Sequence, residues 1–286
     1  MRNSILLIAV ACVFLLAVAC KGRQPETETH EPDIMDSVYS IVHSIPVDIH
    51  LRLWGIQDCP QMMSADLFRG YDDTLLDSIL PEGQAEAGIN VFLLCGKGHI
   101  VLFDAGLGAA KGGRLATDVL ASPHPTPDQI TDICITHLHF DHVGGLFNPD
   151  GTAAFPAATL HIPQVEYEAW ASGKMGDSEI TAQIDRCYEG RIDLFTPGDT
   201  LLGYIATISA PGHTPGHTIY DLGRVLIVGD ILHAVALQVD HPEFCARFDA
   251  DPKQAVATRR AILDRARTEH LTLCGMHFPR PLTIEF

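Results

Sequence analysis

Four side chains of the kinds that bind metals stand within six consecutive positions of the chain. Residues 136–145 read Thr-His-Leu-His-Phe-Asp-His-Val-Gly-Gly, and they contain His137, His139, Asp141 and His142. Imidazole and carboxylate suit zinc and similar borderline metals. A His-x-His pair at the end of a strand can aim both rings to one side, because side chains repeat every second residue. Asp141 and His142 lie in the turn that follows and can face a second ion.

Three further metal-type side chains each follow an apolar run of the kind that forms strands. Residues 211–217 read Pro-Gly-His-Thr-Pro-Gly-His, and their Pro and Gly residues predict a tight turn that presents His213. Gly-Asp follows the apolar run 225–228 and Gly-Met-His follows the run 271–274, which adds Asp230 and His277. This recurrence of strand, glycine and ligand predicts one shared site at one edge of the sheets.

Short apolar runs and helical stretches alternate along the chain. The runs predicted as strands are 89–94, 100–103, 133–136, 158–162, 191–195, 204–209, 218–222, 225–228 and 271–274. Many of them are apolar throughout, which is typical of strands covered on both faces. Helices are expected over 163–171 and, after an N-cap at Asp251 and a first-turn Pro252, as far as about residue 269. The fold class is therefore α/β or α+β with layered sheets.

The first 36 residues are predicted to be a targeting segment and a tether. Residues 5–19 are an unbroken apolar run, too short for a comfortable membrane span of about 20 residues, and fit the core of a signal peptide. The ending Leu-Ala-Val-Ala-Cys resembles a bacterial lipoprotein signal, so residues 1–20 are interpreted as one, with Cys20 as the lipid-bearing residue. Simple secretion and an uncleaved anchor are the alternatives. Residues 21–36 form a flexible tether and 37–286 the folded domain, placed in the bacterial cell envelope, lipid-anchored or periplasmic or secreted.

The charge balance is strongly acidic. The chain has 19 basic and 36 acidic residues, for a formal net charge of −17. Such a surface repels phosphate backbones, which argues against nucleic acid as a partner and leaves a small molecule as the expected substrate. The simplest interpretation of the charge itself is solubility.

Six cysteines lie beyond the signal segment. Those predicted to be buried small hydrophobes, because they lie in apolar runs, are Cys95, Cys134 and Cys274. The chain has no Cys-x-x-Cys spacing, so a thiolate zinc site is not expected. The others, which could form a disulfide in an oxidising compartment without any pairing being indicated, are Cys59, Cys187 and Cys245.

The order of these motifs resembles the metallo-β-lactamase-fold hydrolase superfamily. The resemblance is carried by Thr-His-x-His-x-Asp-His-x-Gly-Gly, then Gly-His-Thr-Pro-Gly-His, then Gly-Asp and a late His, and it covers roughly residues 88–280. Asn-Val-Phe-Leu at 90–93 and Leu-Phe-Asp-Ala-Gly at 102–106 also match the family's early strands and their Asp-x-Gly turn. The implied fold is a four-layer αβ/βα sandwich with the metals at one edge.

The resemblance also implies a role for each ligand. One ion would be held by His137, His139 and His213, the other by Asp141, His142 and His277, and both by a bridging Asp230. The implied cofactor is a pair of divalent metal ions, with zinc expected. Asp104 and His217 are expected to form hydrogen bonds around the site instead of binding metal.

Particular residues indicate which branch of the superfamily the chain resembles. True β-lactamases usually have Cys or Ser at the position of Asp230. Glyoxalase II-like thioesterases share the seven ligands but usually add a C-terminal helical domain, and nuclease branches add a large insert. This chain most resembles the lactonase and methyl-parathion-hydrolase-like branch. In N-acyl-homoserine lactonases the residue three after the bridging Asp is often Tyr, and here it is His233, which puts a lactone substrate in doubt without excluding it.

The predicted activity is hydrolysis of an ester, a lactone or a phosphotriester-like small molecule. A water shared by two metal ions has its pKa lowered from about 15.7 toward about 7, which gives a bridging hydroxide at neutral pH. Asp141 is expected to serve catalysis by holding the ion that polarises the substrate. His233 could donate a proton or a hydrogen bond to the leaving oxygen, with a surface position as the alternative.

Three other functions remain open. The same ligands could hold iron in a dioxygenase-like oxidoreductase, the chain could be a glyoxalase II-like thioesterase, or it could be a metal-stabilised binding module without catalysis. The apolar residues that could wall a substrate cleft, or instead pack as core or as the contact of a homodimer, are Trp54, Met62, Met63, Phe68, Tyr71, Phe140, Leu146 and Phe147.

Overall fold

The computed structural model describes residues 42–48, 50–115, 125–176 and 178–286. The predicted signal peptide, Cys20 and the tether lie outside these ranges. None of the helices in the described ranges combines the length and apolarity needed to cross a membrane.

Seven strands in sequence order form the first sheet. They are β1 (Val42–Asp48), β2 (Leu51–Ser64), β3 (Gln84–Gly96), β4 (His99–Phe103), β5 (Asp132–Cys134), β6 (Thr159–Pro163) and β7 (Ile192–Phe195). Neighbours from β1 to β4 are antiparallel, whereas β4 to β7 are parallel. Parallel neighbours need crossover connections, and these long connections at the carboxyl ends of β4, β5 and β6 leave room for functional loops.

The second sheet has six strands, in the order β13-β12-β11-β10-β9-β8. They are β8 (Thr200–Leu201), β9 (Ile205–Ser209), β10 (Thr218–Asp221), β11 (Val225–Gly229), β12 (Thr272–Gly275) and β13 (Thr283–Glu285). Only β11 and β12 are parallel, and α8 (Pro252–Glu269) connects them. The other pairs are antiparallel.

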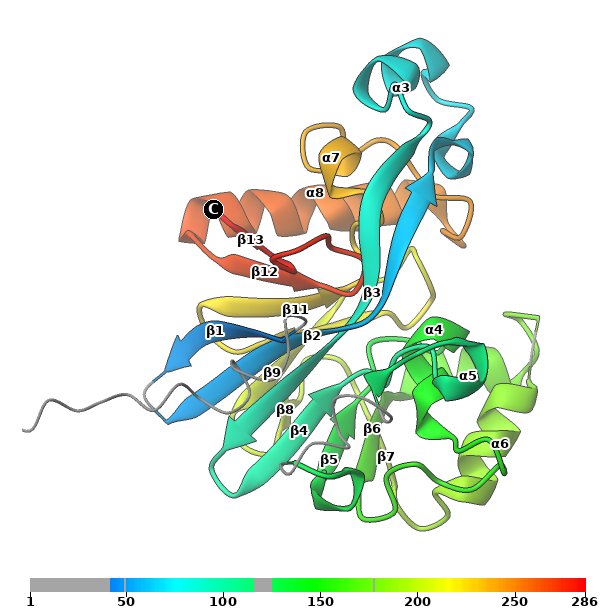
Figure 1. Cartoon of the computed structure of the whole chain (residues 1–286), viewed down its shortest axis with the longest axis vertical. Coiled ribbons are helices and arrows are strands. Elements are labelled where there is room, and N and C mark those ends of the chain that lie inside the picture. The colour runs from blue at the N-terminus through cyan, green and yellow to red at the C-terminus, as the bar shows by residue number, and fades with distance from the viewer. Residues whose placement is uncertain (1–41, 49, 116–124, 177) are drawn as a thin grey trace, which may run out of the picture. The chain divides into compact units, whose positions relative to one another are not determined.

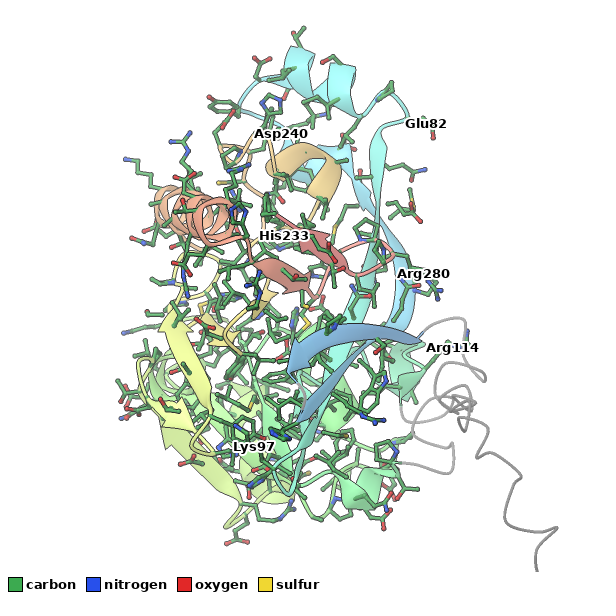
Figure 2. The ribbon with its side chains drawn as sticks, turned by 90° about the vertical axis from the view of Figure 1, so that its left-hand side faces the viewer. Glu82, Lys97, Arg114, His233, Asp240 and Arg280 are labelled. Carbon is green, nitrogen blue, oxygen red and sulfur yellow. The ribbon has the colours of Figure 1, made fainter. Side chains whose placement is uncertain are left out.

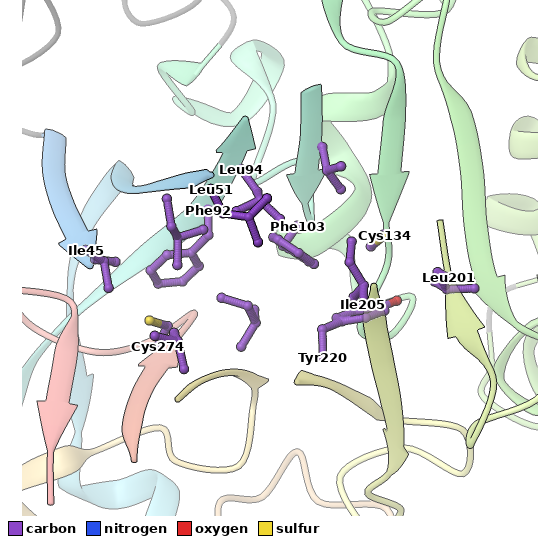
Figure 3. Packing of buried hydrophobic residues seen from close by; sticks show 14 of the residues in the cluster. Ile45, Leu51, Phe92, Leu94, Phe103, Cys134, Leu201, Ile205, Tyr220 and Cys274 are labelled. Carbon is purple, nitrogen blue, oxygen red and sulfur yellow. The ribbon is translucent and has the colours of Figure 1, made fainter. Parts of the chain in front are cut away.

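The two sheets pack face to face through one apolar core. Its side chains come from both sheets, among them Phe92 and Phe103 from the first and Tyr220, Ile227 and Cys274 from the second. Figure 3 shows Phe92, Phe103, Tyr220 and Cys274 between the strands. On the outer faces, α5 (Gln164–Ala171) and α6 (Glu179–Cys187) lie beside β6 and β7, and α8 covers the second sheet (Figure 1). The result is the predicted sandwich of four layers, helix, sheet, sheet and helix.

The long helix α8 forms where the sequence predicts it. The Asp251 side chain accepts a hydrogen bond from the backbone N–H of Gln254, and Pro252 occupies the first turn. His270 ends the helix in a left-handed conformation. Ile262 and Leu263 are buried against the second sheet, and burial of each stabilises the fold by about 1.5–3 kcal/mol.

The hairpin of β2 and β3 extends past the sandwich (Figure 1). It carries η1 (Ala65–Phe68) and α3 (Asp73–Ile79), which pack with α7 (Val235–Gln238) in a small core of their own. The strands β1 and β2 were not predicted. The 14-residue β2 includes Pro60, which cannot donate to a strand ladder, and a register shift between Gln57 and Cys59, so neither strand periodicity nor propensity is regular there.

The apolar residues before β3 divide between core and surface. Trp54, Met63 and Phe68 are buried, so the interpretation as core holds for them, whereas Met62 and Tyr71 are 51% and 63% exposed. The six cysteines are free thiols. As predicted, Cys134 and Cys274 are fully buried, but Cys95 near the end of β3 is only partly buried.

A chain of ionisable groups crosses the parallel strands of the first sheet. The His161 ring on β6 donates to Asp193 on β7 at 2.8 Å and to Asp132 on β5 at 2.9 Å, and His99 contacts Asp132 from β4. Burial lowers the pKa of His161, but the two carboxylates outweigh it and raise the pKa above its usual value. Burial raises the pKa of Asp132, but hydrogen bonds from His161, Thr131 and His99 outweigh burial and lower the pKa to about 2. His161 is therefore an imidazolium that joins three strands.

We expect His161→Gln to destabilise the fold by about 2 kcal/mol at pH 6, since it removes charge-assisted hydrogen bonds from two carboxylates. Because the pKa of His161 is raised in the folded state, its contribution is complete below the unfolded pKa and is lost as pH rises through the folded value. Urea unfolding at pH 6 and pH 9 measures both effects. The exposed His270→Gln is the control, and an equal penalty at both pH values would contradict the imidazolium assignment.

Candidate metal centre

The candidate ligands lie in loops that leave the carboxyl ends of strands from both sheets. His137 and His139 follow β5, and His139 is the N-cap of the short helix α4 (Phe140–Val143). His213 lies in the turn between β9 and β10, Asp230 directly follows β11, and His277 follows β12. Strand, turn and ligand thus recur at one edge, as the sequence predicts.

Three imidazoles from two loops form the first group. The distance from His137 Nε2 to His139 Nδ1 is 2.9 Å, from His139 Nδ1 to His213 Nε2 2.9 Å, and from His137 Nε2 to His213 Nε2 3.2 Å. The Asp230 Oδ2 atom lies 3.3 Å from His213 Nε2 and 3.8 Å from His137 Nε2. These four side chains could hold one metal ion.

The second group also contacts Asp230. His277 Nε2 is 3.4 Å from Asp141 Oδ2 and 3.1 Å from Asp230 Oδ2. His142 Nε2 is 3.2 Å from Asp230 Oδ1 and 3.8 Å from Asp141 Oδ2. Asp141, His142 and His277 could hold a second ion. The structure therefore brings all seven predicted ligands together, with the two oxygens of Asp230 turned toward both groups.

The hydrogen bonds of the rings decide where their lone pairs point. Thr136 Oγ donates to Asp104, so the contact of 3.1 Å between this hydroxyl and His137 Nδ1 makes the ring nitrogen the donor. His213 Nδ1 donates to Asp249 at 3.0 Å. When neutral, the two rings carry lone pairs on their Nε2 atoms, which lie 3.2 Å apart. Either a proton on one of the two nitrogens or a metal ion between them removes the repulsion of these lone pairs.

The second group shows the same arrangement. His142 Nδ1 donates to Asp104 at 2.7 Å and His277 Nδ1 donates to the carbonyl of Gly88 at 2.9 Å, so in both rings Nε2 is the nitrogen that faces Asp230. The buried His142 Nε2 and Asp230 Oδ1 have no hydrogen-bond partner. Metal–nitrogen bonds of about 2.0–2.1 Å in a tetrahedron place neighbouring donors roughly 3.3 Å apart. The residues present therefore fit a pair of metal ions.

Electrostatics keep the central carboxylate charged. Burial raises the pKa of Asp230, but the nearby rings, His142 and His277 foremost, outweigh it and hold the pKa well below its usual range. Burial also lowers the pKa of His139 to about 3, whereas Asp230 and Asp249 overcome burial and raise the pKa of His213 to about 9. Metal binding must displace protons from rings such as His213, so affinity for metal should fall as pH falls.

Asp104 positions the second group. It ends β4 with a positive φ of 58° and is fully buried. One oxygen accepts from the backbone N–H of Thr136, and the other accepts from the Thr136 hydroxyl and from His142. One carboxylate thus fixes the start of the ligand loop and the tautomer of a ligand, as expected for Asp104 from the sequence.

Glu166 near the start of α5 joins two ligand loops, a role the sequence did not suggest. It is fully buried, and it accepts from the backbone N–H groups of Leu138 and Gly216 and from the Trp170 indole. An acidic residue near a predicted helix start is expected on the surface, so the sequence gives no sign that Glu166 is buried. His217, expected to be structural, donates to the Ala210 carbonyl and accepts from the backbone N–H of Asp230.

His233 lies inside the site and not on the surface. Its Nε2 is 3.3 Å from Asp230 Oδ2, its ring stacks on His277 with centroids 5.3 Å apart, and it is 1% exposed. Figure 2 shows it among the side chains between α8 and the C-terminal strands. Gln238 fixes its backbone by accepting from the His233 N–H. Neither ring nitrogen has a hydrogen-bond partner, so both remain available to a metal ion or a substrate.

Two exposed aromatic rings stand beside the ligands. Phe140, between His139 and Asp141, is 41% exposed and carries the Lys111 ammonium 4.0 Å from its ring centroid. Phe248 is 46% exposed, and its ring centroid lies 5.9 Å from that of His233. Leu146 is instead fully buried, so it belongs to the core.

Comparison with known proteins agrees with this fold. The family model described as "Metallo-beta-lactamase superfamily" matches residues 86–277, and the chain belongs to that superfamily. The crystal structure of hydrolase AbOPH in the beta lactamase superfamily superposes with a TM-score of 0.76 at 26% identity, over 86% of this chain and 93% of that one. AidC, a dizinc quorum-quenching lactonase, gives 0.75 at 23% identity, over 85% and 92%.

The match to one curated relative spans a smaller part of both proteins. The hydroxyacylglutathione hydrolase of Vibrio parahaemolyticus is 30% identical over 123 residues, which are 43% of this chain and 38% of that protein. The shared part is thus well under half of that relative.

We expect Asp104→Asn to weaken binding of one of two metal ions by about 10- to 100-fold, because the amide cannot accept from Thr136 and His142 together. Competition with a chromophoric chelator measures the affinity. Asp221→Asn is the matched control, since Asp221 pairs with Arg265 away from the site. Unchanged affinity in Asp104→Asn would show that Asp104 does not position His142.

Proposed function

We propose that the protein is a dinuclear-metal hydrolase that uses a hydroxide shared by two ions to cleave an ester, lactone or phosphotriester-like small molecule. The observation that carries the proposal is the convergence of imidazole Nε2 atoms on both oxygens of the buried Asp230. Zinc is the proposed ion, because three imidazoles with a carboxylate suit it. Such a pair of ions, when bound, supplies an activated water and a Lewis acid for the substrate oxygen.

Each protein group has a proposed task. His137, His139 and His213 hold one ion, and Asp141, His142 and His277 hold the other, with Asp230 between them. Asp104, Asp249 and Gly88 orient three of the rings through the nitrogens that face away from the site. Phe140 and Phe248 stand where they could contact an apolar part of the substrate.

The proposed substrate class follows from the similar structures and the chemistry of the site. AbOPH is described as a hydrolase and AidC as a lactonase, and each structure covers more than four fifths of this chain. The hydroxyacylglutathione hydrolase likeness keeps a thioester as the second candidate substrate. Iron-dependent oxidation remains an alternative that metal analysis distinguishes from hydrolysis.

We also propose the location and anchor predicted from the N-terminal sequence. Residues 1–20 would act as a lipoprotein-type signal, with the acylated Cys20 tethering the domain to a membrane of the bacterial cell envelope. A small-molecule substrate is the proposed partner. Cys20→Ser in the full chain should release the protein from the membrane fraction, and labelling with a fatty-acid analogue should fail in that variant. Retained labelling would place the anchor elsewhere.

Asp230→Ala should lose metal and turnover together, since it removes the carboxylate that faces both groups. We expect fewer than two metal ions per chain by elemental analysis, and at least a 100-fold loss of rate on the best substrate of a panel of p-nitrophenyl esters, lactones, phosphotriesters and a glutathione thioester. The exposed Asp240→Ala is the control. Two ions and full turnover in Asp230→Ala would refute the assignment, and an inactive zinc-loaded wild type would favour a binding module.

His233→Gln tests the proposed contact with the leaving oxygen. Burial lowers the pKa of His233, so the ring is neutral near pH 7 and has one N–H to donate. We expect kcat to fall by roughly 100-fold while the metal content stays at two ions per chain. His241→Gln, whose ring contacts Glu243 outside the site, is the control. Loss of metal from His233→Gln would instead make this ring a ligand.

A further inference from the structure

A second cavity lies between the tip of the β2–β3 hairpin and the first turns of α8. Its volume is about 660 Å³, within the range of small-molecule sites. The apolar part of its lining comes from Phe68, Tyr71, Ala246, Pro252 and Val256. None of the candidate metal ligands is among the described residues that line it.

The segment after α7 separates this cavity from the metal centre. Cys245, Ala246 and Arg247 line the cavity. The next two residues face the other way, because the ring of Phe248 contacts His233 and Asp249 accepts from His213. The backbone N–H of Arg247 donates to the Leu67 carbonyl, which fixes the segment to the hairpin. This segment therefore separates the cavity from the metal centre.

The charged part of the lining is basic, although the chain as a whole has a net charge of −17. It consists of four cations and one acid, namely Arg69, Arg247, Lys253, Arg260 and Glu243. Arg69 is held by Asp66 and Asp77 at 2.9 Å each, and Arg260 lies 3.5 Å from Glu243.

Arg247 and Lys253 remain as cations without a counter-charge. Neither side chain makes an ion pair with any residue that the structure describes, and both are exposed at the rim. Two cations beside an apolar hollow match a ligand with an anionic head and an apolar body. A neutral apolar ligand would leave the cations unused, and inorganic phosphate would leave the exposed Tyr71 ring and Val256 uncovered.

We propose that this cavity is a second ligand site, which takes an amphipathic carboxylate with its head at Arg247 and Lys253 and its chain against Tyr71 and Val256. A carboxylate forms charge-assisted hydrogen bonds with both cations. The apolar chain gains from leaving water. This site goes beyond the proposed hydrolase activity and does not depend on it, because its test measures binding.

Calorimetric titration of the metal-loaded full chain with decanoate below its micellar concentration tests the site. We expect one saturable site for decanoate and at least tenfold weaker binding of decan-1-ol. The double variant Arg247→Glu/Lys253→Glu should weaken decanoate at least tenfold and leave decan-1-ol unchanged. Lys174→Glu/Arg224→Glu, which changes the net charge equally at exposed positions outside the cavity, should bind decanoate like the wild type.

Val256→Trp and Asp230→Ala locate the binding. Val256→Trp fills the cavity and should abolish binding of both probes, whereas Asp230→Ala should keep it, because the metal centre is a separate place. Melting temperatures confirm that the variants fold. The proposal is overturned if decanoate does not saturate, if Asp230→Ala removes binding, or if neither Val256→Trp nor the double reversal weakens it. Binding only to phosphatidylglycerol vesicles would also overturn it, since it would assign this face to a membrane.

Discussion

The carboxylate of Asp230 is buried among five imidazole rings, and the rest of the site is arranged around it. The rings whose Nε2 atoms lie 3.1–3.8 Å from its oxygens are His137, His142, His213, His233 and His277. An isolated buried carboxylate is very unfavourable, so this one requires compensating positive charge. Protonated rings such as His213 can supply part of it, and bound metal ions would supply the rest. A single electrostatic requirement thus explains why ligands from both sheets meet at one edge.

The imidazole rings around Asp230 are in turn held in place by hydrogen bonds to other groups. Three ring Nδ1 atoms, which face away from Asp230, donate hydrogen bonds to Asp104, Asp249 and the Gly88 carbonyl. Glu166 holds together the loops that carry His139 and His213. Arg259, fully buried in α8, contacts Asp249 at 3.3 Å and so supports His213 from behind. These supports lie on several strands and helices. The sandwich therefore matters to the chemistry because it fixes the orientation of each ring.

Much of this was predictable from the sequence. The ligands of the two groups occupy short motifs, and these motifs follow apolar runs. Both the motif and the run are local sequence signals, so all seven ligands could be named from the sequence. The structure brings the seven together in one place. Helix α8 was predicted with its N-cap because Asp251-Pro252 is a strong local start signal. The strand β2 was not predicted, because Pro60 and the irregular register beside Cys59 obscure the alternation of its side chains. Pairing with β3 decides its place in the sheet. The same long pairing creates the hairpin that bounds the second cavity.

The sequence by itself determined the kind of chemistry, because metal ligands must be particular residue types and their spacing survives as a linear pattern. Only the tertiary structure decided the orientation of each ring, the burial of His233, the role of Glu166 and the separation of Cys245–Arg247 from Phe248 and Asp249. These depend on contacts between residues distant along the chain, such as Leu138 with Glu166 or Gly88 with His277. No local pattern encodes such pairs, since the packing of the two sheets and their helices brings them together.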